Sequence, residues 1–391
     1  KMNKNFLFIF VFLNVAFLKA QSIDSLISKD QFEQQKWVDS LMQQMTLDEK
    51  IGQLFMVQAY SNKDEKHKLF MDSLIENYKI GGLIFMQGTP EKQVLLTNAY
   101  QATSKIPLLI GFDGEWGLDM RLQNTYRFPW NMTLGAIRDN SLITAFGVQV
   151  GKHCKRMGIH INFAPVVDIN TNPENPIIGN RSFGEDRENV TQKAQAFING
   201  IQSQNVLANA KHFPGHGDTD TDSHKLLPVI EFDIKRLDSI ELYPYKQLVK
   251  GNLTSIMVAH LSVNALESNT ELPTSLSYNV ITELLKKKLQ FNGLILTDAL
   301  NMKGASNYAQ PGEIDVAAIL AGNDILLIPE DVPAAVLKIQ NALNEKILTI
   351  ERLEYSVQKI LKAKYWAGLN KYKAIELNNL LEDLNSFQDE L

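Results

Sequence analysis

The chain contains only one cysteine, Cys154, among its 391 residues. A single thiol provides neither a disulfide framework nor a thiol cluster for metal or redox chemistry. Basic residues are not in excess either, because 39 lysines and arginines stand against 44 aspartates and glutamates, for a formal net charge of -5. Without a basic field to neutralise phosphates, nucleic acid is excluded as the main partner.

Long hydrophobic runs are also lacking. The most apolar stretch, residues 6–18, is thirteen residues long and contains Asn14, whereas a helix that spans a bilayer needs about 20 residues. Lys1 and Lys4 precede this stretch and the small residue Ala20 follows it, which is typical of an export signal. We therefore expect residues 1–20 to be a signal peptide, an exported periplasmic or secreted protein, and no membrane span after signal removal. An uncleaved anchor is the alternative.

What the sequence does contain is a regular alternation of short apolar runs with amphipathic stretches. Eight runs are predicted to be strands, at residues 54–57, 82–86, 107–112, 161–167, 207–213, 255–259, 293–296 and 325–328. Eight helices are predicted between or after them, near 65–78, 90–102, 140–157, 188–203, 233–250, 278–289, 312–321 and 331–344.

Eight strands that alternate with helices predict parallel strands joined by right-handed crossovers. That number closes naturally into a (β/α)8 barrel of the TIM type, and an open doubly wound sheet is the rival arrangement. We expect one barrel domain over residues 30–368, including a last helix over 348–366. Residues 369–391 are expected to form a docking helix or the start of a linker.

One stretch, residues 211–224, concentrates the polar chemistry of the chain. It reads KHFPGHGDTDTDSH and holds three of the seven histidines, three aspartates and a lysine. It follows an apolar run and therefore lies at the C-terminal end of a predicted strand, where α/β proteins place their active sites.

Three interpretations of this stretch are open. It is a structural loop whose polar groups satisfy one another, a metal site built from His212, His216, Asp222 and His224, or an acid/base site. The spacing is not that of a helical zinc site. The acid/base interpretation is favoured because Asp222 lies two residues from His224, close enough to orient one ring nitrogen and leave the other for proton transfer.

The string KHFPGHG, followed after four residues by DSH, resembles the signature of glycoside hydrolase family 3, in its β-N-acetylglucosaminidase branch. The resemblance implies that Asp222 and His224 form the acid/base dyad, and that Lys211 and His212 bind sugar hydroxyls. Two further segments agree. FDGEWG and MRL resemble a family segment in which Asp113 and Arg121 match sugar-binding positions, whereas Trp116 and Leu118 depart from it.

The segments APVVD and RSFG also resemble the family and make Arg181 a substrate-binding candidate, with an ion pair to Asp168 or Glu185 as the alternative. Asp168 itself is expected to be structural. The segment TDALNM resembles the family's nucleophile segment, which assigns that role to Asp298.

The resemblance implies a retaining glycosidase that acts on non-reducing β-linked N-acetylglucosamine, with peptidoglycan fragments as the expected carbohydrate partner. It implies no cofactor and no metal. A protonated histidine in place of a second carboxylate would repel an anionic acceptor less, so a phosphorylase is the alternative. A non-catalytic sugar-binding barrel is a third possibility.

Overall fold

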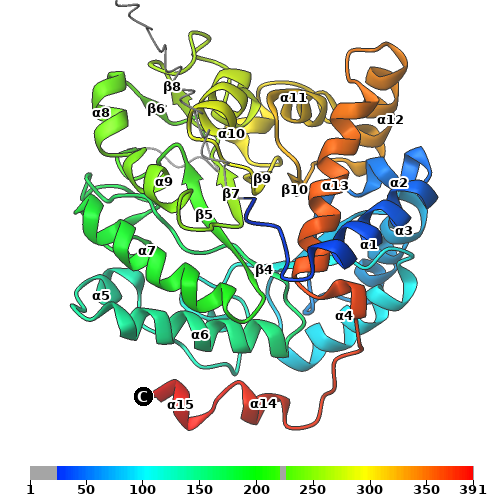
Figure 1. Ribbon diagram of the computed structural model, residues 1–391, viewed down its shortest axis with the longest axis horizontal. Helices are drawn as coiled ribbons and strands as arrows, with labels where there is room; N and C mark the ends of the chain where they lie inside the picture. Colours follow the sequence, from blue (N-terminus) through cyan, green and yellow to red (C-terminus); the bar gives the residue numbers. More distant parts are fainter. Residues whose placement is uncertain (1–23, 221–225, 391) are drawn as a thin grey trace, which may run out of the picture.

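The strands form one parallel sheet that curves into a barrel, as seen in a computed structural model that describes residues 24–220 and 226–390 (Figure 1). The strand order is β10-β1-β2-β3-β4-β5-β7-β9. A parallel bridge between Leu296 and Ile325 joins the two outer strands and closes the ring. The strands of the barrel are β1 (Phe55–Ala59), β2 (Gly82–Phe85), β3 (Leu109–Phe112), β4 (Ile161–Asn162), β5 (Leu207–Phe213), β7 (Ser255–Val258), β9 (Leu294–Thr297) and β10 (Leu326–Leu327).

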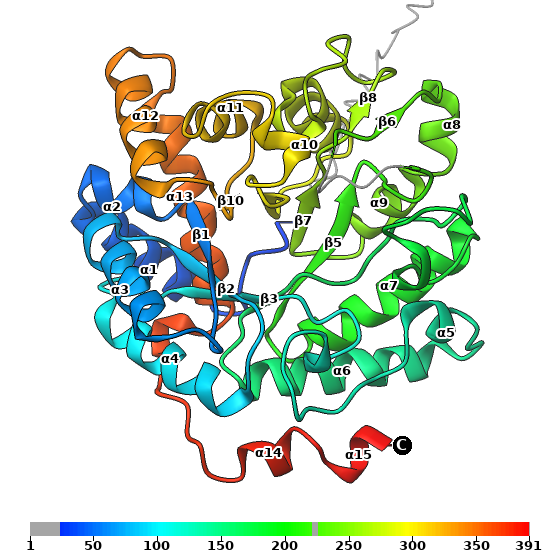
Figure 2. The same ribbon diagram turned by 180° about the vertical axis from the view of Figure 1, so that it is seen from behind.

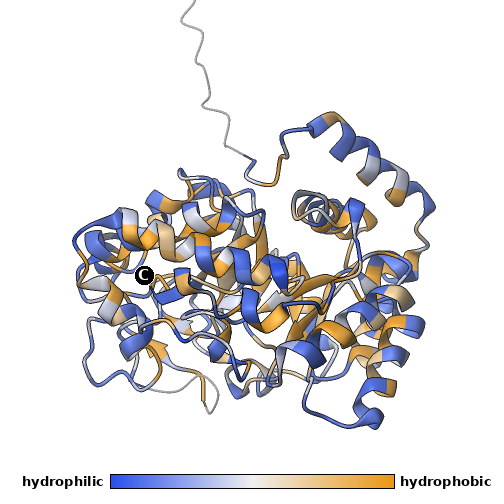
Figure 3. Ribbon diagram, turned by 90° about the horizontal axis from the view of Figure 1, so that it is seen from below, coloured by the Kyte–Doolittle hydropathy of each residue, from blue (hydrophilic) through white to orange (hydrophobic). Residues whose placement is uncertain are grey.

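Helices surround the barrel and carry their apolar residues toward the strands (Figures 2 and 3). The longer ones are α1 (Gln31–Gln44), α3 (Glu65–Tyr78), α4 (Pro90–Thr103), α6 (Asn140–Arg156), α7 (Arg187–Gln202), α11 (Glu313–Ala321), α12 (Val332–Asn344), α13 (Ile350–Trp366) and the π-helix η4 (Asn279–Lys288). The shorter ones are α2 (Leu47–Gly52), α5 (Asn131–Gly135), α8 (Ile234–Ser239), α9 (Tyr243–Leu248), α10 (Lys303–Ser306), α14 (Leu380–Asp383) and α15 (Phe387–Glu390). Single 3-10 turns are η1 (Leu118–Met120), η2 (Gly179–Arg181), η3 (Thr274–Leu276) and η5 (Leu369–Lys371).

The predicted (β/α)8 barrel is confirmed, and each of the eight predicted strands overlaps an observed one. The fully buried strands explain why they read as apolar runs and not as alternating patterns. The open doubly wound alternative is wrong because β9 and β10 pair and complete the ring.

The structure differs from the prediction in the length of one strand, in the division of one helix and in one additional pair of strands. The fourth strand, expected over 161–167, pairs regularly only at Ile161–Asn162, because Pro165 has no N–H to donate to a neighbour. The helix expected over 233–250 is divided into α8 and α9, and Pro244 stands in the first turn of α9, where proline is tolerated. An additional parallel pair, β6 (Val229–Ile230) with β8 (Ser262–Val263), was not predicted.

The two ends of the described chain pack on the outside of the barrel. α1 lies against α13, where Trp37 contacts Tyr365 with ring centroids 5.8 Å apart. The last segment crosses α6 (Figure 1), where Arg156 binds Asp383 at 2.7 Å and His153 binds Asp389 at 3.0 Å. Both contacts lie toward the end of α6 that leads into β4, which is the end of the barrel opposite the strands' C-terminal ends. In residues 24–220 and 226–390, no helix combines the length and apolar character needed to cross a membrane.

Candidate active site

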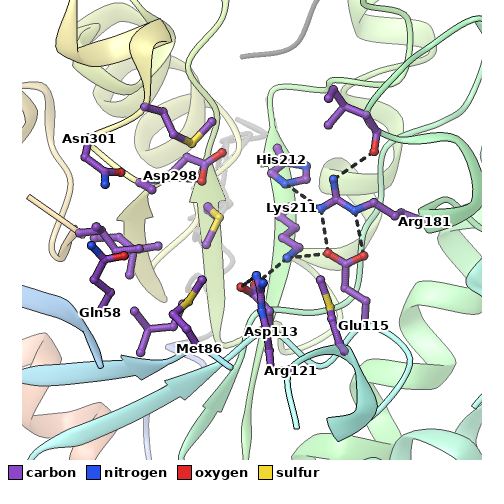
Figure 4. A pocket seen from close by; sticks show the side chains of 18 of the residues that line it. Gln58, Met86, Asp113, Glu115, Arg121, Arg181, Lys211, His212, Asp298 and Asn301 are labelled. Carbon is purple, nitrogen blue, oxygen red and sulfur yellow. Dashed lines mark hydrogen bonds and ion pairs between the residues drawn. The ribbon is translucent and has the colours of Figure 1, made fainter. Parts of the chain in front are cut away.

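A cavity of about 440 Å³ opens at the C-terminal ends of the barrel strands. This is the end where (β/α)8 proteins collect their functional residues. Six of the eight residues predicted for the site line this cavity together and come from different parts of the chain (Figure 4): Asp113, Arg121, Arg181, Lys211, His212 and Asp298. The cavity has the size of a small-molecule site.

The carboxylate of Asp113 forms ion pairs with two cationic side chains. It follows β3, and its Oδ2 lies 2.6 Å from Arg121 Nη2 while its Oδ1 lies 3.1 Å from Lys211 Nζ. Burial acts to raise the pKa of Asp113, but the charges of Lys211 and Arg121 outweigh it and hold the pKa below its usual value. Asp113 is therefore an anion, which can accept hydrogen bonds from the hydroxyl groups of a ligand.

Glu115 is a site residue that the sequence analysis did not select. Both of its oxygens bind Arg181, at 3.0 Å from Nε and 2.8 Å from Nη2, and Lys211 Nζ lies 2.8 Å from its Oε1. Despite complete burial, which disfavours the charge, these cations hold the pKa of Glu115 far below its usual value. The sequence feature that could have identified Glu115 is its position two residues after Asp113, in the same segment that follows β3.

Arg181 is therefore held by a bidentate ion pair, but not by the partners that the alternative interpretation named. Its carboxylate partner is Glu115, and its Nη1 also donates to Ile177 O at 3.2 Å. Because Arg181 lines the cavity and its planar group is fixed, it can present its remaining donor capacity to a ligand in one orientation.

Asp168 fixes the end of β5 and the loop that follows it through hydrogen bonds. Its Oδ2 lies 2.7 Å from Nδ1 of His212, and its Oδ1 accepts the backbone N–H of His216 at 2.7 Å. Burial acts to raise the pKa of Asp168, but the hydrogen bond from His212, the charge of this ring when it is protonated, and the backbone N–H of His216 lower the pKa by more. Asp168 acts through the two histidines, and we find it in the structural role that was expected.

The loop after β5 lies in close contact with the segment after β4. A Cβ on Gly217 would lie only 1.8 Å from Ile169 O, so a side chain cannot be accommodated there. Burial and the neighbouring His212 lower the pKa of His216 to about 4, which keeps its ring neutral at physiological pH. Its Nδ1 lies 2.6 Å from Thr219 Oγ1.

Asp298 stands directly after β9. Its Oδ1 accepts the N–H of Ala299 at 2.8 Å. Burial raises the pKa of Asp298, but the charges of His212 and His260 when protonated, the Ala299 N–H and Lys211 lower it by more. Its carboxylate is thus ionised at neutral pH. His260, close to the end of β7, is fully buried and bonds to Ser275 Oγ and Ala299 O.

Two predicted catalytic residues, Asp222 and His224, lie outside the described residues, in the segment 221–225. The metal interpretation relied on these two residues together with His212 and His216. Across residues 24–220 and 226–390, no group of three or more histidine, cysteine or carboxylate side chains is arranged to hold a metal ion.

Trp116, one of the two departures from the family segment, packs against a second tryptophan. Its ring centroid lies 4.2 Å from that of Trp130, and it is not among the residues that line the cavity.

The fold and the segments that build the cavity define the class of protein. Residues 46–363 match the model of the glycosyl hydrolase family 3 N-terminal domain, and the chain belongs to this family. This confirms the family that the sequence motifs indicated.

The chain is similar in sequence to several named members of this family. It is 33% identical over 327 residues to Beta-hexosaminidase A of Pseudoalteromonas piscicida, a match that covers 75% of this chain and 54% of that protein. It is 33% identical over 316 residues to a Beta-hexosaminidase of Glaesserella parasuis, covering 78% of this chain and 87% of that one. The chain thus spans little more than half the length of the Pseudoalteromonas relative and 60% of a Cellulomonas fimi Beta-N-acetylglucosaminidase/beta-glucosidase.

Solved structures agree on the fold. A family 3 beta-N-acetylglucosaminidase from Paenibacillus sp. superimposes with a TM-score of 0.80 at 33% identity, covering 87% of this chain and 68% of that chain. Beta-glucoside phosphorylase BglX, bound to 2FGlc, gives a TM-score of 0.87 at 27% identity, covering 94% of this chain and 67% of that chain.

Proposed function

We propose that this protein is a retaining glycoside hydrolase that releases non-reducing β-linked N-acetylglucosamine, with peptidoglycan fragments as its substrate. The observation that carries the proposal is the pairing, within one sugar-sized cavity, of an ionised Asp298 with the polar cluster of Asp113, Arg181 and Lys211. The beta-hexosaminidase names of the relatives support the choice of sugar.

The reaction needs an anion at C1 of the sugar and a proton donor at the leaving oxygen. In the first step Asp298 forms a bond to C1 while the glycosidic C1–O bond breaks, and His224 gives its proton to the leaving oxygen. In the second step water attacks C1, the bond to Asp298 breaks, and His224 takes the proton of water. Two inversions at C1 retain its configuration.

The other residues of the cavity bind and orient the sugar. Asp113 accepts hydrogen bonds from hydroxyls, and Arg181 and Lys211 donate them. Because Glu115 and Asp168 fix Arg181 and His212 before substrate arrives, little orientation is lost on binding. In the proposal Asp222 orients His224 and stabilises its charged form.

A phosphorylase is the second candidate, because the BglX structure resembles this chain over nearly its whole length. The charges of the cavity favour water over phosphate as the group that attacks C1. Arg121, Arg181 and Lys211 are each paired with Asp113 or Glu115, so a phosphate would have to compete with carboxylates already in place.

Product analysis separates the two candidates. The protein would be incubated with an N-acetylglucosaminyl anhydro-muropeptide, with and without inorganic phosphate. Free N-acetylglucosamine in both cases supports the hydrolase. Appearance of N-acetylglucosamine 1-phosphate, only when phosphate is present, would replace it with the phosphorylase. Binding of the sugar without any product would favour the non-catalytic barrel.

Export is part of the same proposal, since cell-wall fragments are met outside the cytoplasm. It is supported by the short apolar segment 6–18 and its preceding lysines.

A further inference from the structure

Two carboxylates of the candidate active site lie on opposite sides of the barrel. Asp113 follows β3 and Asp298 follows β9, and both line the cavity. Around the ring, β4, β5 and β7 separate these two strands on one side, and β2, β1 and β10 separate them on the other. A ligand that reaches from Asp298 to Asp113 therefore crosses the cavity and has one of these two groups of strands along each edge.

The two sides of the cavity differ in charge. The side of β4 and β5 contributes Arg181, Lys211 and His212. Among the described residues that line the cavity, those on or directly after β1, β2 and β10 are uncharged: Gln58, Ile84, Met86, Leu327 and Ile328. Figure 4 shows Gln58 on one side of the cavity and Arg181 with Glu115 on the other. The uncharged side is thus an apolar surface that contains one amide.

The amide of Gln58 has a fixed orientation and an unused donor. Its Oε1 accepts the hydroxyl of Tyr60 at 3.1 Å, and the backbone N–H of Tyr60 donates to His67 Nε2 at 3.0 Å. The Nε2 of Gln58 donates to no residue in 24–220 or 226–390, and the side chain is half-buried in the cavity wall. Because polar groups inside a protein are normally hydrogen-bonded, this N–H group is available to a ligand.

Ile328 forms part of the same wall in an unusual backbone conformation. Its φ of 48° lies in the left-handed region, which is rare for a β-branched residue. The conformation is fixed because its N–H donates to Met56 O at 2.8 Å and its carbonyl accepts the N–H of Asn301 at 3.2 Å. Such strain is concentrated at functional sites, where the surrounding structure maintains it. Ile328 therefore belongs to a surface that is shaped for a ligand.

A pyranose ring matches these two sides in one orientation. C1 and C4 are opposite atoms of the ring, so the proposed attack of Asp298 on C1 places C4 toward Asp113. One edge of the ring, C2–C3, carries the acetamido group and a hydroxyl, which suit the charged side. The other edge consists of C5 and the ring oxygen and carries the CH2OH group of C6. That edge suits an apolar surface with a single polar group that fixes orientation.

From this arrangement we infer that Gln58 determines specificity for the hydroxymethyl group at C6. Its Nε2 donates to O6, and Met86 and Ile328 pack against C5 and C6. Tyr60 is a positioning residue, because its hydroxyl holds the amide of Gln58. The inference rests on the proposed function, which supplies the sugar and the position of C1, and it adds a requirement for a free hydroxyl at C6.

Two substrates that differ only at C6 test this role: nitrophenyl N-acetyl-β-glucosaminide and its 6-deoxy analogue. The variants are Gln58→Leu, which keeps the approximate size of the side chain without its amide, and Tyr60→Phe, which removes only the hydroxyl. Gln35→Leu is the matched control, because Gln35 is exposed on α1 and donates to Asp39 on the surface.

For the wild type, kcat/KM should be about tenfold lower on the 6-deoxy analogue, which is the scale of one neutral hydrogen bond. Gln58→Leu should lower kcat/KM by about tenfold on the parent substrate and by less than about twofold on the analogue, so that the two become nearly equal. Tyr60→Phe should lower kcat/KM by about threefold on the parent substrate alone, because the amide is then free to rotate. Gln35→Leu should match the wild type on both substrates.

Equal kcat/KM of the wild type on the two substrates would overturn the inference while leaving the proposed function intact. A loss in Gln58→Leu of the same size on both substrates would give Gln58 a structural role and would also overturn it. If Gln58→Leu does not fold, the same comparison with Tyr60→Phe decides the question. A wild type that releases no nitrophenol from the parent substrate would contradict the proposed function itself, and the inference with it.

Discussion

At the scale of single residues, Asp298 differs from the other carboxylates of its cavity. Asp113 and Glu115 are each held by two cations, whereas no ion pair within residues 24–220 and 226–390 includes Asp298. Its pKa is kept low by cationic groups that do not contact it and by a hydrogen bond from the N–H of Ala299. A carboxylate that is ionised without being neutralised in an ion pair remains available as a nucleophile.

Replacing Asp298 by alanine removes the carboxylate that we propose as the nucleophile. We expect kcat for release of nitrophenol from its N-acetyl-β-glucosaminide to fall by about 10³ or more. Asp119→Ala is the matched control, because Asp119 lies near the cavity but pairs with Arg127 on the surface. Activity of Asp298→Ala close to that of the control would remove Asp298 from the mechanism.

The proposed role of His224 as proton donor is tested by varying the leaving group of the substrate. His224→Ala should slow substrates with poor leaving groups far more than activated aryl glycosides, because only the former need protonation in the first step. The comparison is a series of aryl N-acetyl-β-glucosaminides of increasing phenol pKa. Equal losses along the series would contradict an acid role for His224.

The residues of the site were predictable to the extent that motifs mark them. Asp113 and Asp298 directly follow β3 and β9, and Lys211 and His212 lie at the end of β5, so each was identified as a polar residue that comes after an apolar run. Glu115 was missed because its importance lies in which cations it binds, and those partners come from distant segments. Sequence spacing carries no information on such a pairing.

At the scale of elements, helices and strands were predicted well where hydrophobic periodicity determines them. α3 begins and ends as expected, and the capping box of Thr46 and Glu49 is present. The π-helix η4 was predicted only as a helix, because its hydrogen-bond register does not change the apolar face that the sequence shows. β4 was predicted too long, because apolar character alone does not reveal where a proline interrupts pairing.

One contact joins three elements where the barrel closes. Asp324, just before β10, accepts from Lys359 Nζ at 2.5 Å and Ser356 Oγ at 2.7 Å on α13, and from Ile295 N at 3.0 Å on β9. Removing one partner of a buried pair leaves an uncompensated charge. We therefore expect Asp324→Ala to lower the free energy of unfolding by about 3–5 kcal/mol.

Urea unfolding at pH 7 measures this effect, with Glu283→Ala as the control, because Glu283 belongs to an exposed pair with Lys287. Burial raises the pKa of Asp324, but Lys359, Lys286 and Arg352 lower it to about 2 from 3.8. The contribution of Asp324 to stability is therefore complete above about pH 4 and is lost as the pH falls toward about 2. A loss for Asp324→Ala no larger than that of the control would contradict this role.

At the scale of the whole molecule, the barrel brings together residues that are far apart in the chain. Lys364 on α13 is fully buried and donates to Gln53 Oε1 at 2.5 Å, across 311 residues of sequence. Burial lowers the pKa of Lys364 to about 7. Between about pH 7 and 10.5 the unfolded chain therefore holds a proton that the folded protein has released, and stability rises with pH.

Lys364→Met should abolish this rise. Urea unfolding of both proteins at pH 7 and pH 9.5 measures it, and we expect the wild type to gain about 2–3 kcal/mol more than the variant between the two pH values. Lys346→Met, at an exposed position, should behave like the wild type. A parallel pH dependence of wild type and Lys364→Met would show that the Lys364 ammonium keeps its charge in the folded protein.

The closed array of eight strands was the most predictable property of the molecule, because the alternation of strands and helices limits the possible topologies. The pairing of β6 with β8 was not predicted, because two residues in each strand are too few for a periodic pattern.

The charges of the candidate active site have one further consequence. Three cations, Arg121, Arg181 and Lys211, share the cavity with three anions, Asp113, Glu115 and Asp298. Because the charges of these six side chains balance, we expect an uncharged sugar to enter the cavity without displacing many counterions. Dissolved salt should then have little influence on how tightly the terminal sugar is bound.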